Sequence, residues 1–498
     1  MLVNSMTEQD QYPQAALSER IALRLREMPA DLETPVSVYL KLAGSGPSFL
    51  LESVTGGEQV ARYSFIGVQP SRAYALYGRE LHITSLDDER RTEVQTLPED
   101  QIPLMALRQV LDSQRYPTIP GLPRFSGGLV GYLSYEAVRF FEPSVRLEAH
   151  RMLPDALFLQ ADILVAFDHA FGKLLLIGNP NSKMSADEID AQLDEIERRL
   201  GGPLPAPPAA RPPVPVDDHA NMTRDEFTAA VRKAKEHIAA GDIFQVVLSQ
   251  RMSHATSAHP FDIYRILRRV NPSPYMFFFD FDGLTGEEPL YLIGASPEMH
   301  VRLEEGVAAI RPIAGTRHRG QNPAEDAVLE QELLADPKER AEHVMLVDLA
   351  RNDLGRICRY GSVRVTEQMG IERYSHVMHI VSHVEGELRP EYDAFDLLCA
   401  TFPAGTVSGA PKIRAMQIIS QLEKDARGPY AGAVGYFSYD GSLDTCITIR
   451  TLLLQGSTLH LQAGAGIVAD SNPEAEYQET LNKLRALAVA VEMSEAKP

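Results

Sequence analysis

Two pairs of glutamates, each spaced by three residues within a predicted helix, are the clearest candidates for chemistry. The two side chains of each pair lie on one side of the helix, because positions i and i+3 share a face. The pairs are Glu339 with Glu342 and Glu476 with Glu479, the second followed by Lys483. Such pairs are most often solvated and ion-paired. Two facing pairs, however, would supply the oxygen ligands that Mg²⁺ binds while it keeps positions open for a substrate.

The helix that carries the first pair has a clear start. Asp336 suits the N-cap, Pro337 suits the first helical position, and Glu339 falls where a capping-box glutamate belongs. Capping therefore explains Glu339 structurally and leaves Glu342, one turn further on, without a structural role.

Two glycine-rich loops could hold an anion. The sequence FPAGTVSGAPKIRAMQII, residues 402–419, runs from a strand-like end into a predicted helix. The sequence QAGAGIVADSNPEAE, residues 462–476, ends a strand and leads into the second glutamate helix. Free backbone N–H groups at such helix starts bind anions. Neither loop matches a phosphate-loop or dinucleotide-binding pattern, and each taken singly reads as a tight turn.

Histidines and cysteines offer fewer candidates. Three histidines, His376, His379 and His383, lie close together in RYSHVMHIVSHV. The cysteines, Cys358, Cys399 and Cys446, are too few and too scattered for a disulfide framework or a zinc site. We expect the three thiols to be small buried hydrophobes.

These residues must be positioned by two regions, 1–200 and 221–498, which flank a proline-rich segment at 201–220 that reads as a linker. Strands are predicted at 37–42, 48–54, 76–86, 128–135, 156–168, 173–178, 242–251, 275–281, 290–296, 432–439, 445–454 and 458–469. Helices are predicted at 186–200, 223–240, 323–335, 337–350, 393–400, 411–424 and 474–492. Short turns such as Tyr439–Ser442 favour antiparallel pairing, so the pattern indicates an α+β fold.

Composition excludes several classes of protein. Among 498 residues, 48 are basic and 68 acidic, and the net charge of −20 argues against nucleic acid or an anionic membrane as partner. No apolar run approaches the roughly 18 residues of a membrane helix, and the N-terminus does not resemble a secretory signal. We therefore expect a cytoplasmic protein. The chain contains no tryptophan.

Six segments, in this order, resemble the chorismate-binding enzyme family. They are GDIFQVVLSQR, PIAGTRHRG, EHVMLVDLARNDLGR, FPAGTVSGAPKIRAMQII, YAGAVGYFSYDGSLDTCITIRT and QAGAGIVADSNPEAEYQETLNKL. Upstream, SFLLESV and RYSFIG resemble the N-terminal region of anthranilate synthase large subunits and of aminodeoxychorismate synthases. The resemblance implies large, mainly antiparallel β-sheets in a sandwich, with helices packed outside.

The resemblance also implies roles for single residues. Mg²⁺ would be held by Glu342 and Glu479, with Glu339 and Glu476 supporting them. Arg450 and Tyr430 would hold the enolpyruvyl carboxylate of chorismate. The ring carboxylate would be held by Lys483 and by the backbone amides of Gly464, Ala465 and Gly466. Thr406 would contact the substrate, and His379 would be the catalytic histidine.

Two positions bear on the reaction. Relatives that use water as nucleophile carry a lysine where this chain has Gln245, and a neutral amide fits ammonia, which needs no general base. Some aminodeoxychorismate synthases carry a nucleophilic lysine where this chain has Ala314. The resemblance therefore implies formation of anthranilate and pyruvate from chorismate and ammonia. Aminodeoxychorismate synthesis is the alternative, and a non-catalytic ligand-binding protein is a more distant one.

Regulation and a partner are implied as well. The LLES motif at 50–53 and the NPSPYM motif at 271–276 resemble two parts of a tryptophan inhibitor site. The residues of that site would be Glu52, Ser53, Pro274, Tyr275, Met276, Val434 and Tyr436. No cysteine lies in a glutaminase nucleophile motif, so ammonia would come from glutamine through a separate glutamine amidotransferase subunit.

Overall fold

The structure is a computed structural model that describes residues 23–496 except 45, 55–61, 88, 151, 182–183, 207–217 and 375–376. Two twelve-stranded sheets dominate the described residues, and every strand pairing in them is antiparallel. The α+β fold and the antiparallel sandwich expected from the sequence are confirmed.

The first sheet brings both sides of the 201–220 segment together. Its order is β1 (Arg24–Pro29), β10 (Lys173–Gly178), β9 (Ile163–Asp168), β3 (Tyr63–Gly67), β2 (Ser48–Glu52), β13 (Tyr275–Asp280), β14 (Leu290–Ser296), β23 (Thr451–Gln455), β24 (Thr458–Ile467), β12 (Gln245–Ala255) and β11 (His219–Ala220). The short strand β20 (Gly409–Ala410) pairs with β12. Strand β2 lies beside β13 with Glu52 opposite Met276, so this sheet is continuous across the two regions.

The second sheet is shared in the same way. Its order is β17 (Ile313–His318), β19 (Val377–Glu387), β16 (Val307–Ile310), β15 (Met299–Glu304), β22 (Leu443–Ile447), β21 (Ala433–Ser438), β7 (Gly128–Leu133), β8 (Ala156–Ala161), β4 (Arg72–Tyr77), β5 (Glu80–Ser85) and β6 (Thr92–Thr96), with β18 (Arg364–Arg373) beside β19. The division at 201–220 stays a prediction about domain organisation, but both regions contribute strands to each sheet.

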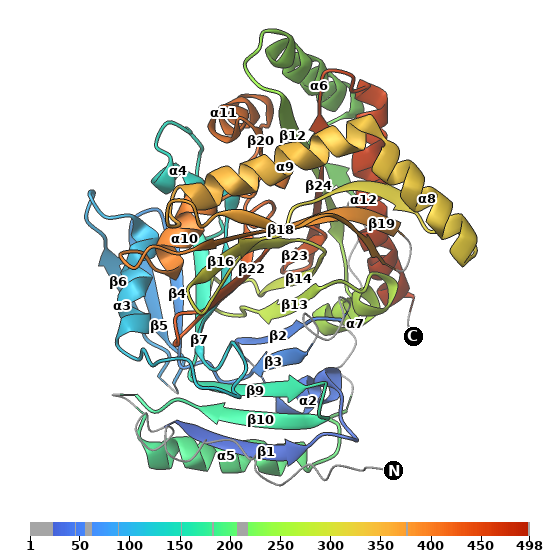
Figure 1. The fold of residues 1–498 in the computed structure, drawn as a ribbon. Coiled ribbons are helices and arrows are strands. Elements are labelled where there is room, and N and C mark those ends of the chain that lie inside the picture. Colours follow the sequence, from blue (N-terminus) through green and yellow to red (C-terminus); the bar gives the residue numbers. More distant parts are fainter. Residues whose placement is uncertain are drawn as a thin grey trace, which may run out of the picture.

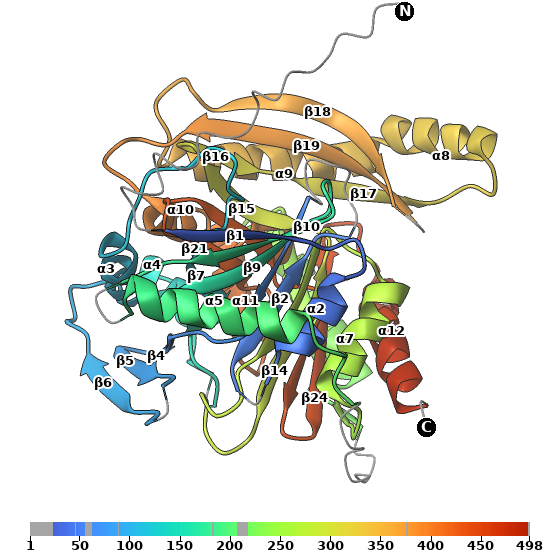
Figure 2. The ribbon, with the colours of Figure 1, turned by 90° about the horizontal axis from the view of Figure 1, so that it is seen from below.

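Helices cover the outside of the sheets (Figure 1). They are α2 (Pro35–Leu42), α3 (Arg108–Asp112), α4 (Val138–Phe141), α5 (Ala186–Leu200), α6 (Arg224–Ala239), α7 (Pro260–Val270), α8 (Pro323–Ala335), α9 (Pro337–Gly355), α10 (Ala394–Thr401), α11 (Lys412–Leu422) and α12 (Pro473–Glu495). Helix α5 runs along β1 and β10, and α9 crosses the second sheet near β16 and β18, as both views show (Figures 1 and 2). In the described part of the chain, no helix is long and apolar enough to span a bilayer.

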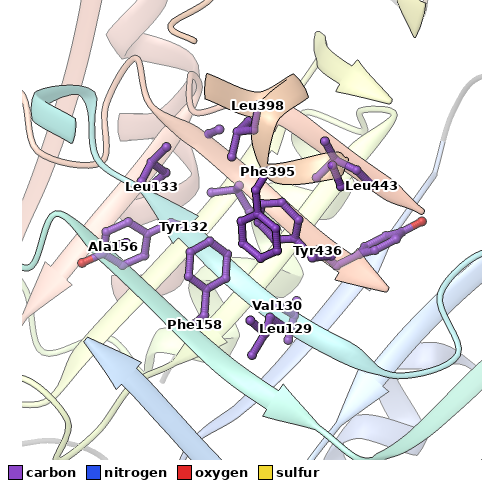
Figure 3. Packing of buried hydrophobic residues seen from close by; sticks show 14 of the residues in the cluster. Leu129, Val130, Tyr132, Leu133, Ala156, Phe158, Phe395, Leu398, Tyr436 and Leu443 are labelled. Atoms are coloured by element: carbon purple, nitrogen blue, oxygen red, sulfur yellow. The ribbon is translucent and has the colours of Figure 1, made fainter. Parts of the chain in front are cut away.

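The largest hydrophobic core lies between the sheets. Tyr132 on β7, Phe158 on β8 and Phe395 on α10 gather in one cluster (Figure 3). Phe395 stacks on Phe437 with ring centroids 4.2 Å apart. A second cluster fills the space between the first sheet and helices α2, α5, α7 and α12. Both clusters fix the strands whose ends carry the candidate site residues.

One predicted strand is wrong. Residues 37–42 belong to α2, because Thr34 caps the helix in a capping box with Ser37 and Pro35 occupies the first turn. The i, i+4 pair Val38 and Leu42 then turns inward, and both side chains are fully buried. Helix α7, the β18–β19 hairpin and strands β15, β16 and β17 were not predicted from the sequence.

Candidate functional site

The floor of the candidate catalytic site is the glycine-rich end of β24. A Cβ atom at Gly464 would lie 2.8 Å from the Tyr430 hydroxyl, and one at Gly466 would lie 2.7 Å from the amide nitrogen of Gln245. Both contacts are too close for a side chain. Glycine is therefore required for the Tyr430 and Gln245 side chains to lie against the strand.

This end of β24 also has an open edge. Strand β23 pairs with β24 only as far as Leu461, whereas β12 continues to Ile467. The Gly464 carbonyl accepts a 2.9 Å hydrogen bond from Lys483 Nζ and therefore faces the open edge. The N–H groups of Gly464 and Gly466 point to the same side, because direction alternates along a strand, while that of Ala465 points toward β12. The Ala465 side chain is fully buried on the other face of the sheet.

Arg450 and Glu298, a cation and an acid, lie together beside this floor. Arg450 precedes β23 with φ 51°, a left-handed conformation that a non-glycine residue rarely adopts. Burial lowers the pKa of Arg450, which also interacts with the charges of Tyr430, Glu298 and Glu479. Burial raises the pKa of Glu298 to about 7. A hydrogen bond from Thr406 and the charges of Lys483 and Arg450 lower this pKa, but by less than burial raises it. Arg450, Lys483, Tyr430 and Thr406 are thus brought together around Glu298.

The predicted metal ligands lie across this floor. Burial raises the pKa of Glu342, and the charges of Glu339 and Glu479 raise it further. Burial likewise raises the pKa of Glu476, with a contribution from the Glu479 charge. The four carboxylates of α9 and α12 are therefore close enough to repel one another. Gln245 Nε2 donates to Glu342 at 3.4 Å, which places the neutral amide at the same site.

These carboxylates fit Mg²⁺ by donor type. Glu479 is paired with Lys483 at 2.6 Å, and Glu339 with Arg317 at 3.3 Å. Across the described ranges, no group of three or more histidine, cysteine, aspartate or glutamate side chains could hold a metal ion alone. Mg²⁺ commonly takes one or two carboxylates and completes its shell with water and substrate oxygens. Glu342 and Glu479 could supply those two carboxylates once Glu479 leaves Lys483.

The capping role expected for Glu339 is replaced by another contact. Asp336 caps α9, accepting the N–H groups of Lys338 and Glu339, but the Glu339 carboxylate does not return to the cap. It meets Arg317 of β17 instead, and Arg317 also binds Asp336 at 2.7 Å. Arg317 therefore orients a carboxylate whose charge raises the pKa of the proposed metal ligand Glu342.

His379 lies on β19 with its ring oriented by the backbone. Its Nδ1 is 3.1 Å from the carbonyl oxygen of Gly315, and a carbonyl only accepts, so Nδ1 carries the proton. Burial lowers the pKa of His379, and the charge of Arg450 lowers it further. The ring is therefore neutral near pH 7 with Nε2 unprotonated. Its neighbours Ser375 and His376 lie outside the described residues. His383 pairs with Glu385 at 3.0 Å.

The seven residues of the predicted inhibitor site line one pocket. The pocket lies between the sheets and has about 580 Å³ of empty space, part of it open to solvent. Its wall includes all seven: Glu52, Ser53, Pro274, Tyr275, Met276, Val434 and Tyr436. The buried hydroxyl of Ser53 has no hydrogen-bond partner within the described structure, so it is available to a ligand.

The carboxylate of Glu52 already has partners. It accepts a hydrogen bond from Tyr264 and pairs with Arg268 at 3.0 Å. An ammonium group in the pocket would therefore share this carboxylate with Arg268. On the opposite wall, Asp444 accepts from Tyr275 at 3.0 Å and pairs with Arg302 at 2.9 Å.

Sequence reasoning missed several polar residues of these sites, among them Glu298, Arg302 and Asp444. Glu298 belongs to no spaced pair, and Arg302 and Asp444 are single charges in strand-like segments. Because side chains alternate along a strand, Asp444 and Cys446 of β22 lie on the same face. An acid that shares a face with an apolar residue indicates a buried carboxylate, and this pattern could have identified Asp444. For Glu298 the sequence alone offers no comparable signal.

Comparison with known proteins identifies the family of this chain. The model of the chorismate binding enzyme family matches residues 46–489. The chain therefore belongs to the chorismate binding enzymes. Its relatives include anthranilate synthase component 1 of Pseudomonas putida, 46% identical over 482 residues that cover 94% of this chain and 95% of that protein. Anthranilate synthase component 1 of Thermus thermophilus is 47% identical over 480 residues, covering 96% and 99%.

A solved structure agrees with the sandwich. The crystal structure of anthranilate synthase component I from Streptococcus pneumoniae matches with a TM-score of 0.76 at 37% identity, covering 92% of this chain and 98% of that one. The menaquinone-specific isochorismate synthase of Escherichia coli matches with a TM-score of 0.68 at 21% identity and shares the fold.

Proposed function

We propose that this chain is the synthase subunit of an anthranilate synthase and converts chorismate and ammonia to anthranilate, pyruvate and water. The observation that carries the proposal is the meeting of Arg450, Lys483, Glu298 and neutral Gln245 beside the carboxylates of α9 and α12. Chorismate is a dianion, and this arrangement offers cations to two carboxylates and an acid to a leaving hydroxyl.

The first half-reaction replaces the hydroxyl by an amine. Ammonia attacks ring C2, the ring double bonds shift, and the C4 hydroxyl leaves as water after it takes a proton. Glu298, whose pKa of about 7 keeps a large share of it protonated at neutral pH, is suited to donate that proton. The neutral amide of Gln245 cannot deprotonate water, so water is not activated here and ammonia acts as the nucleophile. The ammonium formed at C2 then releases a proton.

The second half-reaction releases pyruvate. Loss of the C2 proton forms the aromatic ring as the C3–oxygen bond breaks, and the departing enol of pyruvate takes up a proton to become the keto acid. The unprotonated Nε2 of His379 is suited to accept a proton at this stage. Arg450 and Tyr430 bind the enolpyruvyl carboxylate, and Lys483 with the open edge of β24 binds the ring carboxylate. Glu342 and Glu479, with Glu339 and Glu476 around them, would hold Mg²⁺, which would supply the positive charge that neutralises that ring carboxylate.

Three further features belong to this proposal. L-Tryptophan occupies the pocket around Glu52 and Ser53 as feedback inhibitor, with its indole against Met276, Val434 and Tyr436. A glutamine amidotransferase subunit supplies the ammonia. The reaction takes place in the cytoplasm, in keeping with an acidic chain and three unpaired cysteines.

Product analysis tests the reaction directly. Purified chain supplied with chorismate, Mg²⁺ and an ammonium salt should yield anthranilate, detected by fluorescence, and pyruvate in a 1:1 ratio. An aminated product that retains the enolpyruvyl group, with no pyruvate, would assign the chain to aminodeoxychorismate synthesis instead. Absence of any turnover would leave it a binding protein.

A further inference from the structure

Tyr430 forms part of the wall of a second cavity, which we call the rear pocket. The rear pocket has about 770 Å³ of empty space, and its wall includes Tyr430, Arg251, His150, His460, Gln462 and Arg427. His460, Gln462 and Gly464 alternate along β24 and therefore share one face of the sheet. Because the Tyr430 hydroxyl lies over Gly464, the rear pocket continues along the same face from the floor of the catalytic site.

The rear pocket is lined by basic and uncharged residues, although the protein as a whole is acidic. The whole chain carries 68 acidic residues, yet none of the described residues that line the rear pocket is acidic. The guanidinium of Arg427 is neutralised by Glu423 at 2.6 Å and also donates to two backbone carbonyls. Arg251 is held more loosely, 3.7 Å from a half-exposed Asp425 and with a 3.4 Å hydrogen bond to the Ala426 carbonyl. Arg251 therefore gives the rear pocket a positive charge that a small anion could neutralise.

The two imidazoles add uncharged polar groups. Nδ1 of His150 accepts the backbone N–H groups of Met152 and Leu153 at 3.3 and 3.2 Å, which leaves the ring proton on Nε2. Burial lowers the pKa of His150 to about 4 and that of His460 to about 4, and the nearby charge of Arg251 lowers both further. Both rings are neutral at pH 7. His150, which lines the rear pocket, therefore carries an Nε2–H donor.

We propose that the rear pocket binds a small carboxylate, and that it receives the pyruvate released in the catalytic site. The assignment to pyruvate rests on the proposed function. There, the enolpyruvyl carboxylate lies against Arg450 and Tyr430, and Tyr430 is shared by both cavities. Thr451, which follows Arg450 in the chain, also lines the rear pocket. Once its bond to the ring breaks, pyruvate is a free anion beside a cavity that carries a guanidinium and N–H donors. Ammonium is disfavoured there by the same charge.

Direct binding tests the pocket without turnover. Saturation-transfer NMR of the full chain with pyruvate, in the absence of chorismate and Mg²⁺, gives a dissociation constant for each variant. Arg251→Gln should weaken pyruvate binding about tenfold, since a hydrogen bond to a charged group is lost. His150→Leu, which removes the Nε2 donor, should weaken it several-fold. Arg198→Gln removes a charge from the exposed surface of α5 and is the matched control; its dissociation constant should equal that of the wild type.

The outcomes separate the two proposals. If Arg450→Gln abolishes pyruvate binding while Arg251→Gln and His150→Leu bind as the wild type does, the rear pocket is not the site. A parallel titration with acetate distinguishes the product from any carboxylate in solution. Tighter binding of pyruvate than of acetate supports the assignment, and equal binding overturns it. Failure of the synthase reaction would appear only in the product assay, because this titration requires no chorismate.

Discussion

The carboxylates of α9 and α12 repel one another in the absence of a cation. Glu342 has a raised pKa from burial and from the charges of Glu339 and Glu479. Such repulsion is the expected cost of assembling oxygen ligands on two helices before a divalent ion neutralises them. Lys483 pairs with Glu479 at 2.6 Å, so binding of the ring carboxylate by this lysine in the proposed reaction requires it to leave Glu479.

The first prediction concerns these ligands. Glu479→Gln and Glu342→Gln each remove a charge with little change in shape, so anthranilate formation at moderate Mg²⁺ should fall about 100-fold or more. The melting temperature should stay within about 2 °C of the wild type, because no favourable buried contact is lost. Glu474, on the same helix as Glu479, makes an exposed ion pair with Arg224 of α6; Glu474→Gln is the control and should retain full activity. Near-normal turnover of Glu479→Gln would refute the metal assignment.

The second prediction concerns Glu298. Its pKa is raised from 4.5 to about 7. The folded chain thus holds a proton that the unfolded chain releases at lower pH. The stabilisation that the neutral carboxyl gives the folded chain is fully present below about pH 4.5 and is lost as the pH rises through about 7. The whole shift corresponds to about 3 kcal/mol at 1.36 kcal/mol per pKa unit. Denaturant unfolding of Glu298→Gln should therefore show a smaller loss of stability between pH 5 and pH 8 than the wild type does.

The same variant should lose activity. Removal of a proton donor typically lowers turnover by about 100-fold or more. Glu298→Gln should thus be more stable than the wild type at pH 8 and much less active. A variant with parallel stability profiles and full activity would show that Glu298 neither titrates near pH 7 nor donates the proton.

At the level of single residues, spacing in the sequence was informative where a helix set the geometry. The glutamate pairs and Lys483 were found because a helix places residues three or four apart on one face. Glu298 was missed because its role depends on burial beside Arg450 and Thr406, which come from distant segments. Local spacing carries no information about such an environment.

Among the secondary-structure elements, helices with strong caps were predicted best. The predicted ranges 186–200 and 323–335 coincide with α5 and α8, which begin after Ser185 and Asn322 as N-caps. Residues 37–42 were wrongly predicted as a strand because Val38, Tyr39 and Leu42 give the segment an apolar, strand-like pattern. The capping box at Thr34 stabilises a helix there instead. The β18–β19 hairpin was missed because many residues of β18 are exposed and charged, so it lacks an apolar pattern.

The third prediction concerns the pocket between strands β2, β13 and β21. Tryptophan should inhibit the wild type, and Ser53→Phe, which fills the pocket, should raise the concentration for half-inhibition at least about tenfold with retained activity. Because the chain has no tryptophan of its own, all indole fluorescence comes from the added ligand, and the change in its emission on mixing with the protein reports binding. Ser53→Ala tests the hydroxyl alone and should weaken binding only about two- to tenfold. An enzyme indifferent to millimolar tryptophan would remove the regulatory proposal.

For the whole molecule, the fourth prediction concerns the source of nitrogen. Burial raises the pKa of the Cys358 thiol to about 11 and raises the pKa values of the Cys399 and Cys446 thiols as well. None of the three is therefore suited to attack glutamine at neutral pH. The isolated chain should use ammonium salts, with activity rising as the pH increases the share of free ammonia, and should not use glutamine. Glutamine-dependent synthesis by this chain alone, free of other proteins, would contradict the prediction.

The overall architecture was only partly predictable. Short turns indicated antiparallel pairing, and this is what both sheets show. The order of the strands was not predictable, because β2 pairs with β13 and β7 with β21, and each pair joins segments on opposite sides of the 201–220 segment. Such long-range pairing depends on tertiary packing, which the pattern within a single strand does not encode.

The pairing of β7 with β21 also has a consequence for biosynthesis. Leu133 lies opposite Ala433, so the partner of β7 leaves the ribosome about 300 residues later. At a synthesis rate of about 5 to 20 residues per second, β7 waits about 15 to 60 s with one edge open. During this time the apolar strand GLVGYL, all of whose residues become buried, is exposed to other nascent chains. Expression at lower temperature or with holdase chaperones should therefore raise the soluble yield of this protein more than that of an enzyme of similar size built from local contacts.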